Sequence, residues 1–454
     1  MSEEDTTELV ELASRIAARA RAAGAEVAEA SARSGWELSA RIRLGEPELI
    51  EEAGHRSVAL RVMKNQCVAV TSTSDLSPAG IERCVTDALA LVELSQPDPY
   101  AGPADADRLA KPPFTDLDLY DEAVTRVRAD YAIEQARKAE AAALSSDPRI
   151  KLSEGATFAR TTGTSVLVLS NGFIGAQRGS YVSLVVSPVV EDTGGKRRRG
   201  HYWSARRHLA ELEDAEAVGR EAARRTLAKL GPRKVDTTEA PVVFDQDVAR
   251  SILGTFAGCI LGGAVWRKSS YLCDREGSAV ASPLVEITDD PLIARAPGSR
   301  PFDGEGLPGR RNVVVEGGEL KTFLLDSYSA RKLARASTGN ASRSGGSVSA
   351  TTTNFVLRAG DTSREQLISS TQRGLYVTEM MGFGFNPVTG DFSRGASGFW
   401  IENGRLTFPV SEVTVSANLD TMLKGIDAIA DDLELKTATA APTFRVASMT
   451  IAGS

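Results

Sequence analysis

The chain has 454 residues, 42% hydrophobic and 25% charged, a composition that can bury a sizeable core in two or three domains. Its net charge of −7 offers no general attraction for nucleic acid or an anionic membrane. The acidic start at residues 1–5 lacks the apolar segment of a signal peptide, and no apolar run is long enough to span a bilayer, so we expect a cytoplasmic protein. The cysteines lack CxxC spacing, which predicts buried or free thiols in a reducing compartment: Cys67, Cys84, Cys259 and Cys273.

Residues 1–95 have the pattern of an N-terminal α+β subdomain. Apolar residues at helical spacing predict a helix over 6–23, and Ser77–Pro78 begins a second helix that ends near Leu94. Between them, alternating or β-branched runs predict strands over 25–31, 36–44, 57–64 and 67–73. This order favours an antiparallel sheet with helices on one face.

Residues 96–118 are predicted to be a linker, because the stretch from Ser95 to Pro113 contains five prolines and several aspartates. Residues 119–232 predict a second α+β subdomain with helices over 123–144 and 215–230. Strands are predicted over 156–161, 164–170, 174–178 and 180–190, with a hairpin turn at Asn171–Gly172. The basic run Lys-Arg-Arg-Arg at 196–199 is predicted to lie in a hairpin tip or loop, and a solvated or interface charge patch is favoured over a phosphate site.

Residues 233–454 predict a β-rich C-terminal domain with few helices, which makes the whole chain α+β. A strand over 240–244 leads into a helix over 245–261, and a hairpin is centred on Gly317–Gly318. The remaining expectations are a helical stretch over 329–336, an irregular Ser/Thr/Gly-rich loop over 337–353, helices over 364–374 and 419–433, and strands over 410–416 and 444–451.

A glycine-rich stretch from Glu379 to Gly404 predicts turns, then a hairpin that closes at Asn403–Gly404. Its composition alone favours an ordinary glycine-rich hairpin in a β domain. The functional alternative is a backbone-lined groove that holds another peptide.

Catalytic chemistry has few candidate residues in this sequence. The histidines are His55, His201 and His208, and none belongs to an H-E-x-x-H motif or a near variant. A Ser-His-Asp site would need one of these histidines, and neither a G-x-S-x-G elbow nor a phosphate-binding P-loop is present. A hydrolase site built from Asp, Glu and Cys is a weaker possibility, because no histidine stands ready to activate a thiol.

Several stretches in one order resemble the TldD/PmbA family, in its PmbA (TldE) branch. They are Thr378–Gly382, Val388–Ala396 and Gly398–Gly404, together with Gly262–Ser269, Leu325–Leu333 and Ser337–Gly339. The chain length suits the family from end to end. The resemblance implies a two-component metallopeptidase that cleaves unfolded or flexible peptides, with members active in antibiotic maturation, on antitoxins and as gyrase modulators.

In the catalytic TldD branch, the first helix of the C-terminal domain carries a His-Glu-x-x-x-His zinc motif with Gly before the second His. Matching that Gly to Gly258 puts Gly254, Thr255 and Cys259 at the first His, the Glu and the second His. Gly254 has no ligand atom, and the Thr255 hydroxyl cannot replace a carboxylate as general base near pH 7. A lone thiol such as Cys259 is more often a small buried residue than a ligand. We therefore expect no catalytic or metal-binding residues in this chain, and zinc in a TldD-like partner.

The resemblance thus implies a non-catalytic subunit of a heterodimer, which helps to enclose an unfolded peptide. The candidate substrate or partner contacts are Trp266, Arg267, Tyr328, Arg331, Glu379, Gly382, Gly384, Asp391 and Arg394. Ordinary domain packing is an equal alternative for the Trp266 and Tyr328 segments. The alternative function is a stand-alone peptide-binding or regulatory protein, a homodimer without proteolytic activity.

Overall fold

A computed structural model describes residues 3–453. Residues 1–2 of the predicted N-terminal subdomain and residue 454 of the predicted C-terminal domain lie outside that description. The helices are α1 (Glu3–Ala22), α2 (Pro78–Leu94), α3 (Glu122–Thr125), α4 (Ala129–Ser145), α5 (Ala215–Leu227), α6 (Gln246–Ile260), α7 (Gly262–Trp266), α8 (Ser327–Lys332), α9 (Arg364–Ser369) and α10 (Leu419–Lys424). Short 3₁₀ turns are η1 (Ala106–Arg108), η2 (Thr193–Gly195) and η3 (Leu209–Glu211).

The N-terminal strands are β1 (Val27–Arg43), β2 (Glu46–Lys64), β3 (Cys67–Thr73), β4 (Leu152–Leu169), β5 (Ile174–Glu191), β6 (Arg197–Arg199) and β7 (Tyr202–Arg206). The C-terminal strands are β8 (Thr238–Phe244), β9 (Ile287–Asp289), β10 (Asn312–Glu316), β11 (Glu319–Leu320), β12 (Ala341–Ser344), β13 (Ser347–Ala350), β14 (Phe355–Leu357), β15 (Arg373–Met381), β16 (Asp391–Glu402), β17 (Arg405–Asn418), β18 (Ile426–Ile429), β19 (Thr439–Ala440) and β20 (Phe444–Ala452). The chain is α+β, as its sequence predicts.

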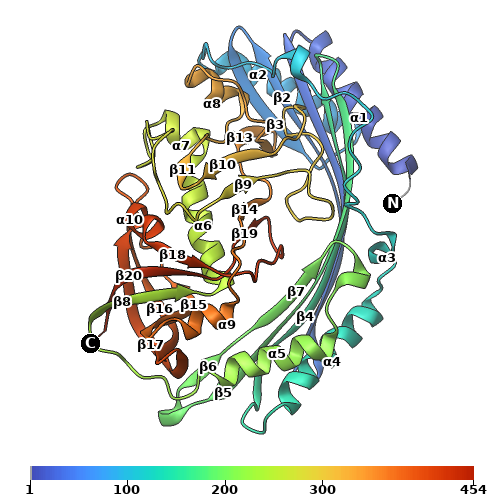
Figure 1. Ribbon diagram of the computed structural model, residues 1–454. Helices are drawn as coiled ribbons and strands as arrows, with labels where there is room; N and C mark the ends of the chain where they lie inside the picture. Colours follow the sequence, from blue (N-terminus) through green and yellow to red (C-terminus); the bar gives the residue numbers. More distant parts are fainter. Residues whose placement is uncertain (1–2, 454) are drawn as a thin grey trace.

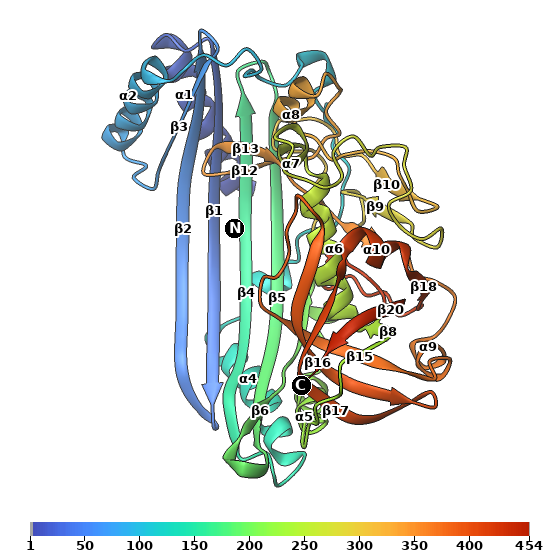
Figure 2. The same ribbon diagram turned by 90° about the vertical axis from the view of Figure 1, so that its left-hand side faces the viewer.

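One long antiparallel sheet runs along the molecule (Figure 2). Within residues 3–453 it has seven strands in the order β3-β2-β1-β4-β5-β6, with β7 also paired to β5. Because β1 pairs with β4, the two predicted N-terminal subdomains contribute to a single sheet. The Asn171–Gly172 turn joins β4 to β5 as predicted, and the linker between α2 and α3 is irregular apart from η1.

The sequence predicted two shorter strands in place of each of β1, β4 and β5, and this prediction is wrong. Gly35, Gly163 and Gly179 fall in the gaps between the predicted strands, but in the structure Gly163 of β4 pairs with Gly35 of β1 and with Gly179 of β5. None of the three has a positive φ, so each stays in an extended strand. The space beside Gly35 is occupied by the His55 ring, since an added Cβ would lie 2.6 Å from its Cε1.

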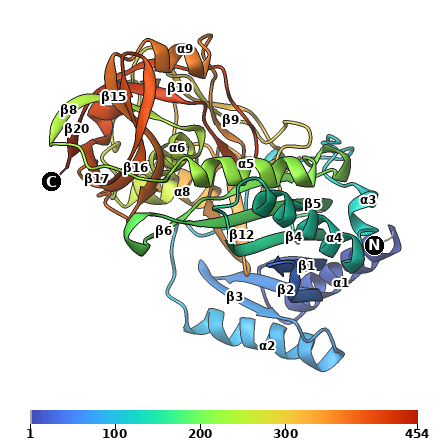
Figure 3. The ribbon, with the colours of Figure 1, turned by 90° about the horizontal axis from the view of Figure 1, so that it is seen from below.

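The two faces of the long sheet have different coverings. Even-numbered residues of β1 are buried under α1 and α2 near one end of the strand, and under α4 and α5 near the other. The opposite face meets the C-terminal domain, through contacts such as the hydroxyl of Tyr181 donating to the Lys436 carbonyl. An aromatic cluster of Phe114, Phe173 and Phe302 joins the linker to both regions. Figure 3 shows the C-terminal domain on the side of the sheet away from α2, and Figure 1 shows it on the side away from α1.

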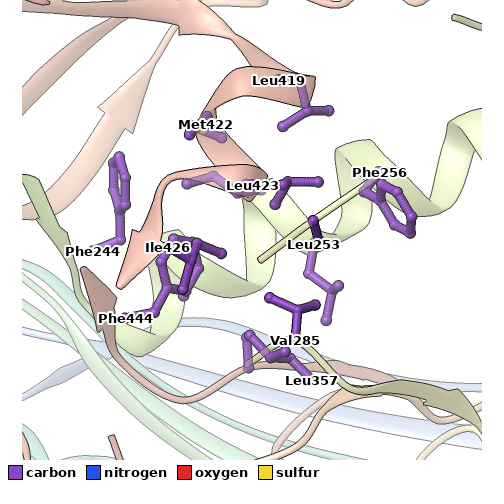
Figure 4. Close-up of a cluster of buried hydrophobic side chains, with 14 of the residues drawn as sticks. Phe244, Leu253, Phe256, Val285, Leu357, Leu419, Met422, Leu423, Ile426 and Phe444 are labelled. Carbon is purple, nitrogen blue, oxygen red and sulfur yellow. The ribbon is translucent and has the colours of Figure 1, made fainter. Parts of the chain in front are cut away.

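The C-terminal domain is built around α6. A sheet with the order β17-β16-β15-β8-β20-β18 and a second with the order β11-β10-β9-β14-β19 share one hydrophobic core with this helix. Phe244 and Phe444 from the first sheet, Leu253 and Phe256 from α6, and Val285 all contribute to that core (Figure 4). The apolar side of α6 is therefore fixed, and only its opposite side is free to meet other molecules.

Three C-terminal predictions are wrong in part. The helix predicted over 419–433 ends at Lys424, because the chain turns at Gly425 and the following residues form β18, paired with β20. Residues 337–353 are not wholly irregular: they contain the β12–β13 hairpin, which turns at Gly345–Gly346 with positive φ at both. The helix predicted over 364–374 stops at Ser369, and β15 begins at Arg373.

The basic run at 196–199 begins at the tip of a hairpin, as predicted, and continues into β6, which pairs with β5. Two of its three arginines form ion pairs: Arg198 with Asp192 at 2.7 Å and Arg199 with Glu154 at 3.2 Å. The hairpins at Gly317–Gly318 and Asn403–Gly404 are confirmed. All four cysteines are free thiols, and no helix in residues 3–453 is long and apolar enough to cross a membrane.

The exposed face of helix α6 and the β15–β16 hairpin as the candidate functional site

Helix α6 is held firmly at its N-terminus. The Asp245 carboxylate caps it by accepting the Asp247 backbone N–H at 3.2 Å, and the Tyr376 hydroxyl donates to the same carboxylate at 2.6 Å. Burial raises the pKa of Asp245 even though these hydrogen bonds favour its charged form. Since Tyr376 lies in β15, this contact ties the start of α6 to the hairpin that carries Glu379.

The solvent side of α6 has almost no side chains. Ser251, Gly254, Thr255 and Gly258 follow one another at helical spacing on this side, and both glycines are exposed. A Cβ added to either glycine would meet nothing within 4 Å in the described chain. Glycine inside a helix costs about 1 kcal/mol relative to alanine. The internal packing of this chain therefore gives no reason for either glycine.

The residues at the positions of the family's zinc motif do not fit a metal ion. Gly254 has no donor atom, and the Thr255 hydroxyl donates back to the Ser251 carbonyl at 3.0 Å. Cys259 is 1% exposed, and burial raises the pKa of its thiol to about 11, so the thiol stays neutral in the core. Across the described residues, no three His, Cys, Asp or Glu side chains are grouped to hold a metal.

Arg394 is the predicted contact residue that the structure brings to this face. From β16, its Nη1 donates to the Ser251 hydroxyl at 3.2 Å. Its Nε is buried and has no hydrogen-bond partner within residues 3–453, and no carboxylate there forms an ion pair with it. Burial lowers the pKa of Arg394, but an arginine stays charged at neutral pH. The exposed face of α6 thus has a partly buried cation at one side.

Glu379 and Asp391, at the two sides of the hairpin turn, have separate local partners. The Lys229 ammonium pairs with Glu379 at 2.5 Å, and the Ser397 hydroxyl donates to it at 3.4 Å. Asp391 accepts hydrogen bonds from the hydroxyl of Thr389 and the amide of Asn418, which lower its pKa. Both carboxylates organise the hairpin within this chain.

The turn between β15 and β16 presents an apolar tip. Phe383 is fully exposed and Met381 is 55% exposed. Gly382 has φ +80°, and a Cβ on Gly384 would lie 1.7 Å from the Ser393 carbonyl oxygen, so both positions require glycine. Beside the tip lies a shallow hollow of about 610 Å³, whose apolar lining includes Phe383, Phe385 and Phe392. An exposed aromatic tip of this kind is typical of a partner contact.

The Trp266 and Tyr328 segments mainly hold the linker. The two rings pack edge to face at 5.8 Å, and the Tyr328 hydroxyl donates to Asp98 at 2.7 Å. The Arg331 guanidinium donates to the carbonyls of Tyr100, Gly102 and Pro103. Arg267 is exposed and lies over the Trp266 ring. For these residues the structure supports domain packing, with only Arg267 left open to solvent.

The open strand edge at which an added peptide could pair lies in β2 and not in the glycine-rich stretch from Glu379 to Gly404. β16 pairs with β15 on one side and β17 on the other, so this strand has no open edge. Residues 46–56 of β2 are all exposed and pair only with β1, because β3 begins to pair with β2 at Val58. The sequence pattern missed this open edge, since residues 46–56 have neither the alternation nor the apolar content of a strand.

The comparisons with known proteins agree across the whole chain. Residues 28–92, 122–230 and 237–453 match domain 1, the central domain and the C-terminal domain of the PmbA/TldA metallopeptidases. The metalloprotease PmbA of Escherichia coli O157:H7 is 38% identical over 451 residues, which cover 99% of this chain and 96% of that protein.

Solved structures match equally broadly. A protein of Bacteroides thetaiotaomicron, described as a candidate modulator of DNA gyrase, has a TM-score of 0.92 and 27% identity over 98% of both chains. TldE of Thermococcus kodakarensis has a TM-score of 0.85 over 97% of this chain and all of that one, and its 20% identity supports the fold alone. The chain belongs to the TldD/PmbA metallopeptidase family, in its PmbA branch.

Proposed function

We propose that this chain is the non-catalytic subunit of a two-chain zinc metallopeptidase, and that a TldD-like partner carries the zinc. The observation that carries the proposal is the surface of α6. Where the catalytic branch has His-Glu-x-x-x-His, this chain has an exposed glycine, a threonine bonded to its own helix, and a buried neutral thiol. None of these groups can activate a zinc-bound water.

The two exposed glycines of α6 support a contact with another molecule. Each costs about 1 kcal/mol of helix stability, and neither is required by packing inside the described chain. A stability cost that is retained at a surface suggests selection for function. Glycines at 254 and 258 would allow another backbone to lie directly against α6, with Arg394 beside it. The exposed Phe383 tip offers a second apolar contact.

An unfolded peptide would be held mainly through its backbone. Residues 46–56 of β2 provide an open strand edge, and pairing with such an edge gives affinity without side-chain specificity. Glu48 and Glu52 on this strand are already paired with Arg41 and Arg160. Glu46 and Glu51 form no ion pair among residues 3–453 and would favour a peptide with basic side chains. This chain would then supply walls and a clamp, and the partner would supply the chemistry. A cytoplasmic location remains part of the proposal.

Cleavage of an unstructured peptide tests the proposal. It is measured with this chain alone, with a TldD-like chain alone and with both together. We expect cleavage only in the mixture, and none from this chain with added zinc. Cleavage by this chain alone would contradict the proposal. Equal cleavage by the partner with and without this chain would leave the stand-alone, homodimeric binding protein as the better account.

A further inference from the structure

A polar pocket of about 540 Å³ lies between the long sheet and the tip of the β12–β13 hairpin, and none of its lining residues belongs to α6. Its floor comes from β1, β2 and the end of β3, and its wall from the hairpin. The hairpin tip rests on the sheet, since a Cβ on Gly346 would lie 2.5 Å from the Val70 side chain. The lining residues are Ser31, Arg33, Ser57, Val58, Ala59, Ser72, Thr73, Ser74, Arg343, Gly345 and Gly346.

The charges around this pocket do not balance. The buried Glu29 carboxylate lies between two guanidinium groups, and it pairs with Arg61 at 2.9 Å and with Arg343. Burial alone would raise the pKa of Glu29, but the two arginines outweigh it and the pKa is lowered, so the carboxylate is charged. Within residues 3–453, neither arginine pairs with a second carboxylate.

Arg33 adds a third positive charge. It is exposed at the pocket, and its guanidinium makes one hydrogen bond, from Nη2 to the Arg343 carbonyl at 3.1 Å. No carboxylate in the described chain pairs with it. Asp75, which follows the lining residue Ser74, accepts the Ser77 backbone N–H. The pocket therefore has an excess of positive charge.

Hydroxyl groups with free donors complete the lining. Ser31, Ser57, Ser72 and Ser74 make no side-chain hydrogen bonds among residues 3–453. Arg343 uses Nε on the Gly304 carbonyl and Nη2 on Glu29, which leaves its Nη1 without a partner in the described chain. Guanidinium and hydroxyl donors that converge on one space match the acceptors of a carboxylate or phosphate group.

We propose that this pocket binds a small oxyanion, a carboxylate or phosphate group, through Arg33 with Arg343 and the serine hydroxyls. Binding of a free anion does not depend on the proposed peptidase function, whereas binding of a peptide terminus rests on it. A free anion is one source of the group. The other is the terminal carboxylate of a peptide, because a peptide parallel to β2 on the open edge at 46–56 would end beside Ser57 and Ser74.

The test is titration of the full chain, by calorimetry at constant ionic strength, with three probes: inorganic phosphate, a short peptide acid and the same peptide as its C-terminal amide. We expect saturable binding of phosphate, of the peptide acid, or of both. Binding should fall at least about tenfold in Arg33→Gln, because a charge-assisted hydrogen bond is lost. Ser72→Glu, at an exposed position, should lose binding to a similar extent because it adds a competing carboxylate.

The control is Arg41→Gln, on the same strand and the same face, where the guanidinium pairs with Glu48 at 2.9 Å; it should bind as the unmodified chain does. Binding of the peptide acid but not the amide would assign the group to a peptide terminus, and binding of phosphate alone would assign it to a free anion. The proposal fails if neither oxyanion saturates the unmodified chain. It also fails if Arg33→Gln and Ser72→Glu leave binding unchanged.

Discussion

Arg394 on β16 donates a hydrogen bond from Nη1 to the Ser251 hydroxyl on α6, at 3.2 Å. This contact places a cation beside the glycine face of the helix, and its buried Nε has no hydrogen-bond partner in the described part of the chain. Among residues 3–453 the guanidinium donates only to this neutral surface hydroxyl, so the arginine stabilises the chain little. Its position is better explained by a contact outside the chain.

The Arg394→Gln variant should therefore fold normally but lower peptide cleavage by the mixture with a TldD-like chain about tenfold, because one charge-assisted contact is lost. Urea unfolding and cleavage rates would be measured on the same preparations. Arg405→Gln, an exposed arginine at the start of β17, is the matched control. An unchanged cleavage rate in Arg394→Gln would assign the residue to local structure only.

Gly254→Ala and Gly258→Ala should each raise the free energy of unfolding by about 1 kcal/mol, since alanine is the better helix former and nothing in the described chain lies near the new Cβ. We expect the same variants to weaken association with the partner, measured by analytical ultracentrifugation. Gly398→Ala is the contrasting control: its Cβ would lie 1.8 Å from the Tyr376 carbonyl oxygen, so it should destabilise the fold. Stabilised variants that pair as tightly as the unmodified chain would rule out a close contact at this face.

Cys259 should behave as a core residue. Its burial raises the pKa of the thiol to about 11, so the folded chain should not react at this position with a thiol reagent at pH 8. Cys259→Ala should cost about 1 kcal/mol of stability and leave zinc content and cleavage by the mixture unchanged. Loss of bound zinc in this variant would show that the thiol is a ligand.

The buried carboxyl group of Glu305 should make the stability of the folded chain depend on pH. Burial, and then the charge of Asp303, raise the pKa of Glu305 from its usual 4.5 to about 7. The folded chain therefore keeps a proton that the unfolded chain releases, so the free energy of unfolding falls as pH rises from about 4.5 to 7. Glu305→Gln should remove about 1–3 kcal/mol of this fall. Urea unfolding at several pH values, with the exposed Glu402→Gln as control, measures it; identical pH profiles would contradict the assignment.

The sequence predicted the fold class, most helices and the hairpins with strong turn residues, because spacing and glycine turns are local signals. It did not predict that β1, β4 and β5 continue through Gly35, Gly163 and Gly179, since the pairing of these residues depends on contacts far apart in sequence. The same limit applies to the site. The sequence predicted the helix α6, and the role of Arg394 as a contact residue stays a prediction. The use of Tyr328 and Arg331 in holding the linker was not predicted, because it depends on tertiary packing.

Zinc analysis of the two chains after mixing and separation tests the central claim most directly. A TldD-like chain and this chain would be loaded with zinc together, separated under mild conditions and measured individually. The account predicts zinc with the TldD-like chain, none above background with this chain, and no change on replacing Thr255 or Cys259 with alanine. Zinc retained by this chain, and lost in either variant, would contradict it.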